Sequence, residues 1–259
     1  MNAKRLYGRR ILVTRPTLQA NELVAAIESA GGEAIRFPVM RIVARDRHDV
    51  ATDFAAAHSP DIAIFVSRNA VEHGLFAVRG SGAKIAAIGS TTAAAIDAQM
   101  VAVDIGSNGG WDSEHLLAQP ALQDIEGLEI TIVRGQRGLE LLGDTLRKRG
   151  ARVTYLPAYE RKINKIPQDE LDQLRDDWTN GRVDCVTVMS VESLEFLLEL
   201  LPKDAIERLP STSLVAPGRR VIQTACELIP GISTTMASGP RAADIVDAVI
   251  EALDPGQGE

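Results

Sequence analysis

The stretch ILVTRPTLQANELVAAIESAGGEAIRFP, residues 11–38, predicts a strand, a helix and a second strand. Residues 11–13 are apolar and fit a short buried strand, and apolar residues then recur with the spacing of one helix face. Gly31 and Gly32 follow the last helical turn, where the backbone often becomes left-handed. Residues 33–38 return to a strand pattern. A strand, helix and strand in this order are typical of a parallel sheet.

The same pattern returns 119 positions later, as ITIVRGQRGLELLGDTLRKRGARVTYLP, residues 130–157. The helix of this copy is marked by Leu139, Leu142 and Leu146, and Arg134-Gly135 before it is expected to be a turn. Three landmarks keep one offset, namely the pairs Arg15 and Arg134, Gly31 and Gly150, and Pro38 and Pro157. The repeat predicts two similar domains.

A second unit also repeats, because residues 61–67 and 184–190 both read as a strand that ends in serine. A helix follows each, and then a further strand at 84–89 and at 212–217. Alternating strands and helices predict a parallel sheet covered on both faces. The expected fold class is α/β, with two similar parallel-sheet (flavodoxin-like) domains.

The domains are expected to be joined by two linker strands, residues 37–43 and 155–163. The chain would start in a discontinuous domain of residues 1–36 and 164–259, with residues 44–154 inserted as the other. A two-stranded linker ladder of this kind predicts a cleft between the domains and can bend during closure on a ligand.

The composition excludes several protein classes. The chain has 259 residues, 45% of them hydrophobic, and a net charge of −7. No apolar run approaches the roughly 18 residues of a membrane span, and the negative charge disfavours a nucleic-acid partner. Residues 11–13 are too short for a signal-peptide core, so a cytoplasmic location is expected. A monomer is expected because no large apolar surface stripe is evident.

Generic catalytic motifs are missing. The sequence has no phosphate loop and no nucleophile elbow, and its two cysteines and four histidines lack metal-ligand spacing. We therefore expect no cofactor and no metal. What remains are hydroxyl and arginine side chains at predicted strand ends, where open α/β sheets bind ligands. They are Thr14-Arg15, Ser67, Gly89-Ser90-Thr91-Thr92, Arg134-Gly135 and Ser190. Each alone could be a helix N-cap, whereas together they could supply donors for an anion.

Six stretches are informative in their order and spacing. They are ILVTRP at 11–16 with GG at 31–32, IFVSRNAV at 64–71, IGSTTA at 88–93, DSEHLL at 112–117, VRG at 133–135 and PAYER at 157–161. With these the chain resembles the uroporphyrinogen-III synthase family of tetrapyrrole biosynthesis. The resemblance implies two α/β domains joined by a two-stranded ladder, and no cofactor.

The family's reaction, as the resemblance implies it, closes hydroxymethylbilane, a polyanionic linear tetrapyrrole, into a ring. The last pyrrole is inverted and water is lost, which makes the enzyme a cyclising hydro-lyase of heme-type biosynthesis. Hydroxymethylbilane synthase is the implied source of the substrate, by hand-over. The alternative is a non-catalytic two-domain ligand-binding or regulatory protein of the same fold.

The resemblance also suggests roles for single residues. Tyr159 is expected to donate a proton to the departing hydroxyl, although a tyrosine could simply pack on the ladder. Thr92 is the second expected catalytic residue. Substrate binding is expected for Arg15, Ser67, Gly89, Ser90, Arg134, Gly135, Ser190 and Arg219. For the serines helix capping is the alternative, and for Arg15 and Arg134 it is capping of a helix end or pairing across the domain interface.

The chain departs from the family pattern at two turns. Gln136-Arg137-Gly138-Leu139 replaces a glycine-rich turn of many relatives, and Arg219-Arg220 stand where the second domain's hydroxyls are expected. These two arginines either bind a carboxylate or start a solvated helix.

Overall fold

The computed structural model describes residues 5–57, 59–107, 110, 112–138 and 140–254. Its contacts divide the chain into unit 1, Met1–Arg41 with Ile163–Glu259, and unit 2, Ile42–Lys162. Within the described ranges, no helix is both long enough and apolar enough to cross a membrane.

Unit 1 contains a five-stranded parallel sheet in the order β11-β10-β9-β1-β2. Counted along the chain, this is the 2-1-3-4-5 order of flavodoxin-like folds. The strands are β1 (Arg10–Val13), β2 (Glu33–Arg36), β9 (Cys185–Thr187), β10 (Ser213–Ala216) and β11 (Thr234–Met236).

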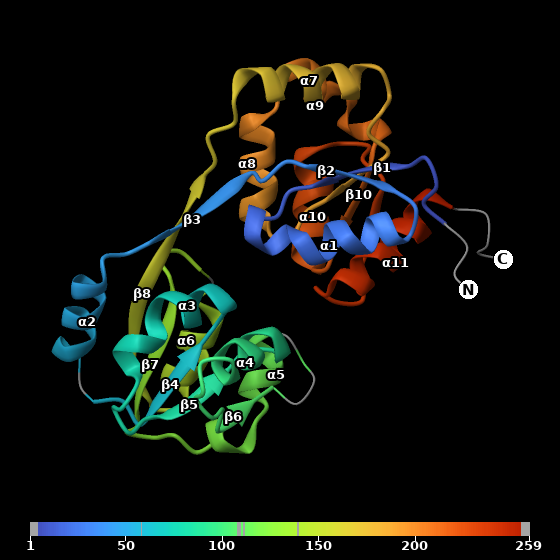
Figure 1. Ribbon diagram of the computed structural model, residues 1–259. Helices are drawn as coiled ribbons and strands as arrows, with labels where there is room; N and C mark the ends of the chain where they lie inside the picture. The colour runs from blue at the N-terminus through green and yellow to red at the C-terminus, as the bar shows by residue number, and fades with distance from the viewer. Residues whose placement is uncertain (1–4, 58, 108–109, 111, 139, 255–259) are drawn as a thin grey trace. The chain divides into compact units, whose positions relative to one another are not determined.

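Helices cover both faces of this sheet, which explains why its inner strands β1, β9 and β10 are almost entirely buried. One face carries α1 (Thr17–Ser29) and α11 (Ala242–Leu253). The other carries α7 (Gln168–Thr179), α8 (Val191–Leu200), α9 (Lys203–Arg208) and α10 (Arg219–Leu228), with the 3-10 turn η2 (Leu209–Ser211) (Figure 1).

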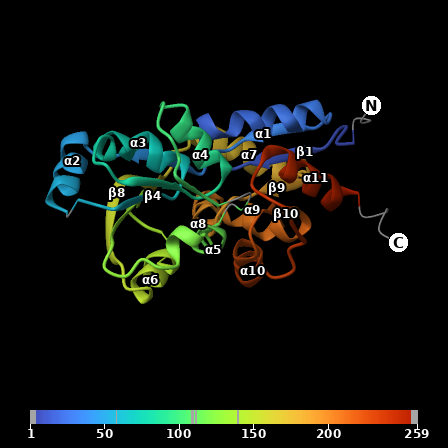
Figure 2. The same cartoon turned by 90° about the horizontal axis from the view of Figure 1, so that it is seen from below.

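Unit 2 contains a six-stranded sheet in the order β3-β8-β7-β4-β5-β6. The strands are β3 (Met40–Ala44), β4 (Ile62–Phe65), β5 (Lys84–Ala87), β6 (Ile105–Gly106), β7 (Glu129–Gly135) and β8 (Arg152–Ile163). One face packs on α2 (Arg47–Ala56), α3 (Arg68–Val78) and α4 (Ser90–Asp97). The opposite face packs on α5 (Ser113–Leu117), the 3-10 turn η1 (Pro120–Leu122) and α6 (Leu141–Lys148) (Figure 2).

The two sheets confirm the strand equivalences predicted from the repeats. The order β2-β1-β9-β10-β11 in unit 1 corresponds position by position to β8-β7-β4-β5-β6 in unit 2. The equivalent helix ends also agree, because Gly31 and Gly150 have φ angles of 88° and 87°. A residue with a side chain is strained at such angles, so glycine fits both positions.

One local prediction needs correction. Arg134-Gly135 is not a turn, because β7 continues to Gly135. The predicted linker strand 155–163 is the second part of one continuous strand, β8, which begins at Arg152. The described part of helix α6 begins at Leu141, and Leu139, predicted as part of that helix, lies outside the described residues.

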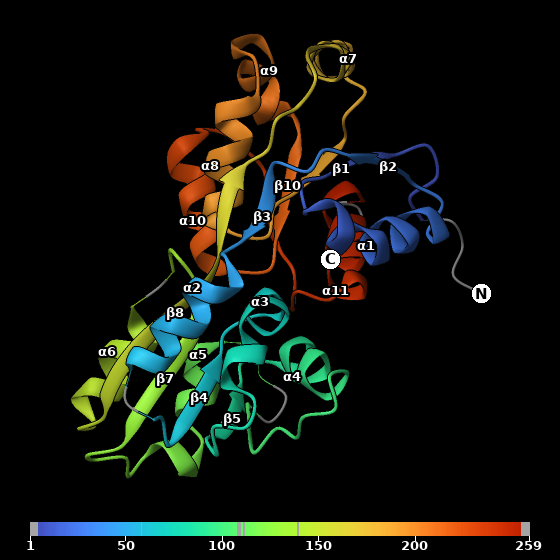
Figure 3. The same cartoon turned by 60° about the vertical axis from the view of Figure 1, so that its left-hand side comes forward.

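β3 and β8 are hydrogen-bonded neighbours, and they overlap the predicted linker segments 37–43 and 155–163 (Figure 3). The Arg45 N–H donates to the Ala158 carbonyl at 3.1 Å, and the Asn164 N–H donates to the Val39 carbonyl at 2.9 Å. Residue numbers increase along β3 as they decrease along the paired part of β8, so the two strands run antiparallel. The cleft between the domains stays a prediction.

A buried carboxylate, Asp177, ties α7 to the sheet of unit 1. Arg10 donates to it at 3.1 Å, and Arg182 donates to it at 2.8 Å. Burial alone would raise the pKa of Asp177, but hydrogen bonds and the charge of Arg10, with help from Gln173 and Arg182, lower it overall.

We expect this carboxylate to make unit 1 sensitive to acid. The pKa of Asp177 in the folded protein lies below the ordinary value of 3.8. The ionised carboxylate therefore stabilises unit 1 fully above about pH 5, and this stabilisation is lost as the pH falls through 3.8 and below it. Asp177→Asn should lower the free energy of unfolding at pH 7 by about 2 kcal/mol, because Arg10 and Arg182 lose their charge-assisted hydrogen bonds to this carboxylate. Urea unfolding at pH 7 and below pH 4 tests this, and a difference between variant and wild type that does not shrink in acid would contradict it.

Candidate active site

The predicted site residues lie at the carboxyl ends of the parallel strands, in one row per unit. In unit 1 the neighbouring strands β1 and β9 connect to β2 and β10, which lie on opposite sides of this pair. In unit 2 the neighbouring strands β7 and β4 connect in the same way to β8 and β5. Open α/β sheets bind ligands at such switch points. The unit 2 row contains Ser67, Gly89-Ser90, Thr92, Arg134-Gly135 and Tyr159. The unit 1 row contains Thr14-Arg15, Ser190 and Arg219.

A β-bulge in β8 decides the direction of Tyr159. The register against β7 shifts between Pro157 and Tyr159, which makes Ala158 an extra residue. Side chains of a regular strand alternate between faces, so Tyr159 would otherwise share the α6 face with Tyr155. The extra residue turns Tyr159 to the α3 face instead. Pro157 is tolerated inside the sheet because bulges accept proline.

Tyr159 is surrounded by polar groups of unit 2 although its side chain is 0% exposed. Its hydroxyl oxygen lies 3.1 Å from Ser67 Oγ and accepts a hydrogen bond of 3.1 Å from Arg161 Nη2. The His73 ring lies 6.1 Å from the Tyr159 ring, centroid to centroid. A Cβ atom at Gly135 would lie 3.0 Å from the Tyr159 ring, so glycine allows this approach.

Ser67 joins this cluster to a helix N-terminus. It is the N-cap of α3, and its Oγ accepts a hydrogen bond of 3.1 Å from the Ala70 N–H. The capping interpretation is therefore confirmed for Ser67, and the contact with Tyr159 is additional. Ser67 is partly exposed, so a ligand can reach it where it cannot reach Tyr159 directly.

The Gly-Ser-Thr-Thr turn forms the N-terminus of α4. Gly89 is the N-cap with a φ of 75°, and its N–H donates to Ser107 Oγ at 3.0 Å. Ser90 is exposed, whereas Thr92 is 2% exposed and faces the interior of unit 2. The first-turn N–H groups and the exposed Ser90 and Thr91 are therefore the groups of this turn that a ligand can reach.

Arg134 is held by its own loop. Its guanidinium pairs with Glu140 at 3.0 Å and donates to the Gly138 carbonyl at 3.0 Å. The same group lies 4.5 Å over the Tyr155 ring, and the residue is 7% exposed. Arg134 is thus engaged within unit 2, and both its expected substrate contact and the alternative of pairing across the domain interface stay predictions.

Arg15, the equivalent residue of unit 1, has a different environment. Its Nη2 donates to the Pro240 carbonyl at 2.7 Å, and its Nε is buried with no hydrogen-bond partner. Burial lowers the pKa of this guanidinium, and the charge of Glu22 partly offsets that effect. Arg15 is therefore a desolvated cation with no ion pair among the described residues.

The remaining residues of the unit 1 row are less specialised. Ser190 is the N-cap of α8, and its Oγ accepts from the Ser193 N–H at 3.1 Å. Arg219 and Arg220 are exposed at the start of α10. Cations oppose the dipole at a helix N-terminus, so these arginines do not stabilise the helix there.

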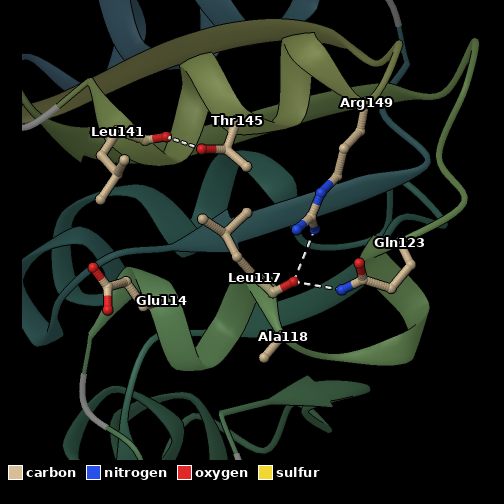
Figure 4. Close-up of a pocket in the computed structure, with 7 residues that line it drawn as sticks. All are labelled: Glu114, Leu117, Ala118, Gln123, Leu141, Thr145 and Arg149. Atoms are coloured by element: carbon tan, nitrogen blue, oxygen red, sulfur yellow. Dashed lines mark hydrogen bonds between the residues drawn. The ribbon is translucent and has the colours of Figure 1, made fainter.

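A wide pocket of about 520 Å³ in unit 2 lies between α5 and α6 (Figure 4). Arg149 and Gln123 donate to the Leu117 carbonyl, and Thr145 donates to the Leu141 carbonyl. Its donors are thus engaged within the protein, and none of the predicted site residues lines it.

Two features of the site were missed by the sequence reasoning. Arg161 beside Tyr159 was not assigned a role, although residues two apart share a face of a strand and this could have indicated it. The contact of His73 with Tyr159 had no sequence signal, because it depends on how α3 packs over β8.

Comparison with known proteins adds independent findings. The sequence pattern of the family described as "Uroporphyrinogen-III synthase HemD" matches residues 21–247. A protein of Escherichia coli strain K12 named uroporphyrinogen-III synthase is 33% identical over 200 residues, which cover 74% of this chain and 80% of that protein. Its namesake from Salmonella typhimurium is 34% identical over 209 residues, with the same two coverages of 74% and 80%.

Solved structures share the fold. A mutant uroporphyrinogen III synthase from the extremely thermophilic bacterium Thermus thermophilus aligns with a TM-score of 0.62 at 21% identity, over 95% of this chain and 99% of that one. The uroporphyrinogen-III synthetase of Helicobacter pylori aligns with a TM-score of 0.61 at 13% identity, over 94% and 99%. With the sequence matches, which cover most of both partners, these findings show that the chain belongs to the uroporphyrinogen-III synthase family.

Proposed function

We propose that this chain closes hydroxymethylbilane into uroporphyrinogen III, with inversion of the last pyrrole ring and loss of water. The observation that carries the proposal is the family match over residues 21–247. Acting in this way, the protein is a cyclising hydro-lyase of heme-type biosynthesis. A cytoplasmic location, a monomeric state and hand-over from hydroxymethylbilane synthase stay predictions from the sequence.

The chemistry agrees with a site that lacks a strong nucleophile. Loss of hydroxide from the substrate creates an electrophilic carbon, which an electron-rich pyrrole can attack without help from a protein nucleophile. The protein must hold one folded conformation of the substrate, and positioning of this kind can contribute about 7–11 kcal/mol in favourable cases. A proton donor for the departing hydroxyl adds about 10²–10⁴-fold.

We assign carboxylate binding to the strand ends and helix N-termini of the two rows. The first-turn N–H groups after Gly89 and Ser90 suit an anion, because they lack partners within the helix and lie at the positive end of its dipole. Arg15 suits a carboxylate because its guanidinium is desolvated, its Nε lacks a hydrogen-bond partner, and it has no ion pair within the described part of the chain. Ser190 and Arg219 complete the unit 1 row with a hydroxyl and a charged donor.

Arg15→Ala should raise KM by about 10-fold or more and change kcat little. A hydrogen bond to a charged group is worth about 1.5–3 kcal/mol, and a carboxylate away from the reacting carbon is bound equally in ground and transition states. Steady-state kinetics with hydroxymethylbilane measure both constants. A fall in kcat with unchanged KM would place Arg15 near the reacting atoms instead.

The proposed function is tested by supplying hydroxymethylbilane to the purified chain and identifying the product isomer. We expect the type III isomer, formed faster than the type I isomer that arises without inversion. If the substrate binds but only type I accumulates at the uncatalysed rate, the chain is a non-catalytic member of the fold.

A further inference from the structure

We propose that Ser67, not Tyr159, donates the proton to the departing hydroxyl, and that Tyr159 re-supplies it. This inference rests on the proposed function and deepens it. All of the groups involved belong to unit 2. It follows from the directions that the hydrogen bonds of Arg161, Tyr159 and Ser67 must take.

The first direction is fixed by Arg161. An arginine has donors and no acceptor, so the hydrogen bond between Arg161 Nη2 and the Tyr159 oxygen, 3.1 Å long, must be donated by Arg161. The phenol oxygen is thus an acceptor at this contact, and its own proton needs another acceptor. Because Tyr159 is 0% exposed, bulk water does not reach it.

The second direction follows from this burial. In the part of the chain that the structure describes, the acceptor within reach of the Tyr159 proton is Ser67 Oγ, at 3.1 Å. A buried donor that is left unsatisfied is costly, so Tyr159 donates and Ser67 accepts.

The third direction concerns the proton of Ser67. Its Oγ already accepts from the Ala70 N–H at 3.1 Å and from Tyr159, and these two bonds use both of its lone pairs. The Ser67 proton must therefore point away from both groups. Ser67 is partly exposed at the switch point between β4 and β7, where a substrate is expected to bind.

The chain of donors gives a balanced proton transfer. The C–O bond of the substrate breaks with its electron pair going to oxygen, and the Ser67 proton moves to that oxygen, so water leaves. The Tyr159 proton moves to Ser67 Oγ, and the resulting phenolate faces the Arg161 guanidinium. The proton released when the attacked pyrrole becomes aromatic again returns along the same path.

The test is a double-mutant cycle on Ser67→Ala and Tyr159→Phe, read as kcat for consumption of hydroxymethylbilane. Each single variant should have a kcat about 100-fold lower than wild type, which is within the range of acid catalysis. The double variant should lose little more, because either substitution alone already interrupts the same proton path. Ser67→Thr keeps the hydroxyl and should restore most of the rate. In wild type, the rate in mixtures of light and heavy water should curve with deuterium fraction, as two protons move together.

Ser67→Ala also removes the N-cap of α3, so a control must remove a helix cap and nothing else. Asp46→Ala is that control, because Asp46 caps α2 in the same unit and is not part of the site. This variant should keep the wild-type kcat. Losses that multiply in the double variant, or a Ser67→Ala variant with full activity, would overturn the relay while leaving the proposed function intact. A wild-type chain that forms no type III isomer would remove the proposed function itself.

Discussion

A Gly74→Val variant is expected to lose about 3 kcal/mol of stability or more in unit 2. Gly74 lies in α3 where the helix backbone rests directly on the sheet, and a Cβ there would lie 2.4 Å from Val133 Cγ1 and 3.1 Å from Ala158 Cβ. Overpacking a core costs about 1–3 kcal/mol for small additions. The gain in helix propensity over glycine is at most about 1 kcal/mol, so the clash prevails.

Chemical unfolding with hydrogen exchange resolved by peptide would assign this loss to unit 2. Gly106→Ala is the matched control, because a Cβ at Gly106 in the same unit would meet nothing within 4 Å. Equal stability of the Gly74 and Gly106 variants would show that α3 can move away from the sheet without cost.

The second large effect is expected for Tyr159→Phe, which should lower kcat by about 100-fold while the protein stays folded. The hydroxyl is the link between Arg161 and Ser67, and the phenylalanine ring fills the same space against Gly135. Slower enzymatic closure also leaves more substrate to the uncatalysed reaction, so the fraction of type I product should rise.

Tyr155→Phe is the control for this prediction. Tyr155 lies in the same strand but packs on the α6 face, where the guanidinium groups of Arg134 and Arg147 contact its ring. It should keep the wild-type turnover and the type III product. Equal losses in both variants would indicate a general effect on β8 instead of a role of the Tyr159 hydroxyl.

Much of the fold could be predicted from the sequence, because it depends on local patterns. Apolar runs of strand length and the glycines after two helices are local signals, and they predicted equivalent strands that the two sheet orders confirm. The positions of Ser67 and Gly89 at strand ends followed in the same way, because the carboxyl ends of parallel strands share one edge.

What could not be predicted depends on contacts between distant segments. β8 passes through Pro157, where a β-bulge accommodates the missing N–H donor. The bulge turns Tyr159 toward Ser67, and no pattern within β8 alone indicates that. The pairing of Arg134 with Glu140 likewise depends on the path of the loop between them.

The division of unit 1 into two segments has a consequence for synthesis on the ribosome. β1 is an inner strand, but its neighbour β9 is translated only after the whole of unit 2. Unit 2 is one continuous segment and can fold as soon as it emerges, since domains generally fold as units. The nascent amino-terminal strands must wait with one edge unpaired, and this interval is where we expect chaperone binding and misassembly to concentrate.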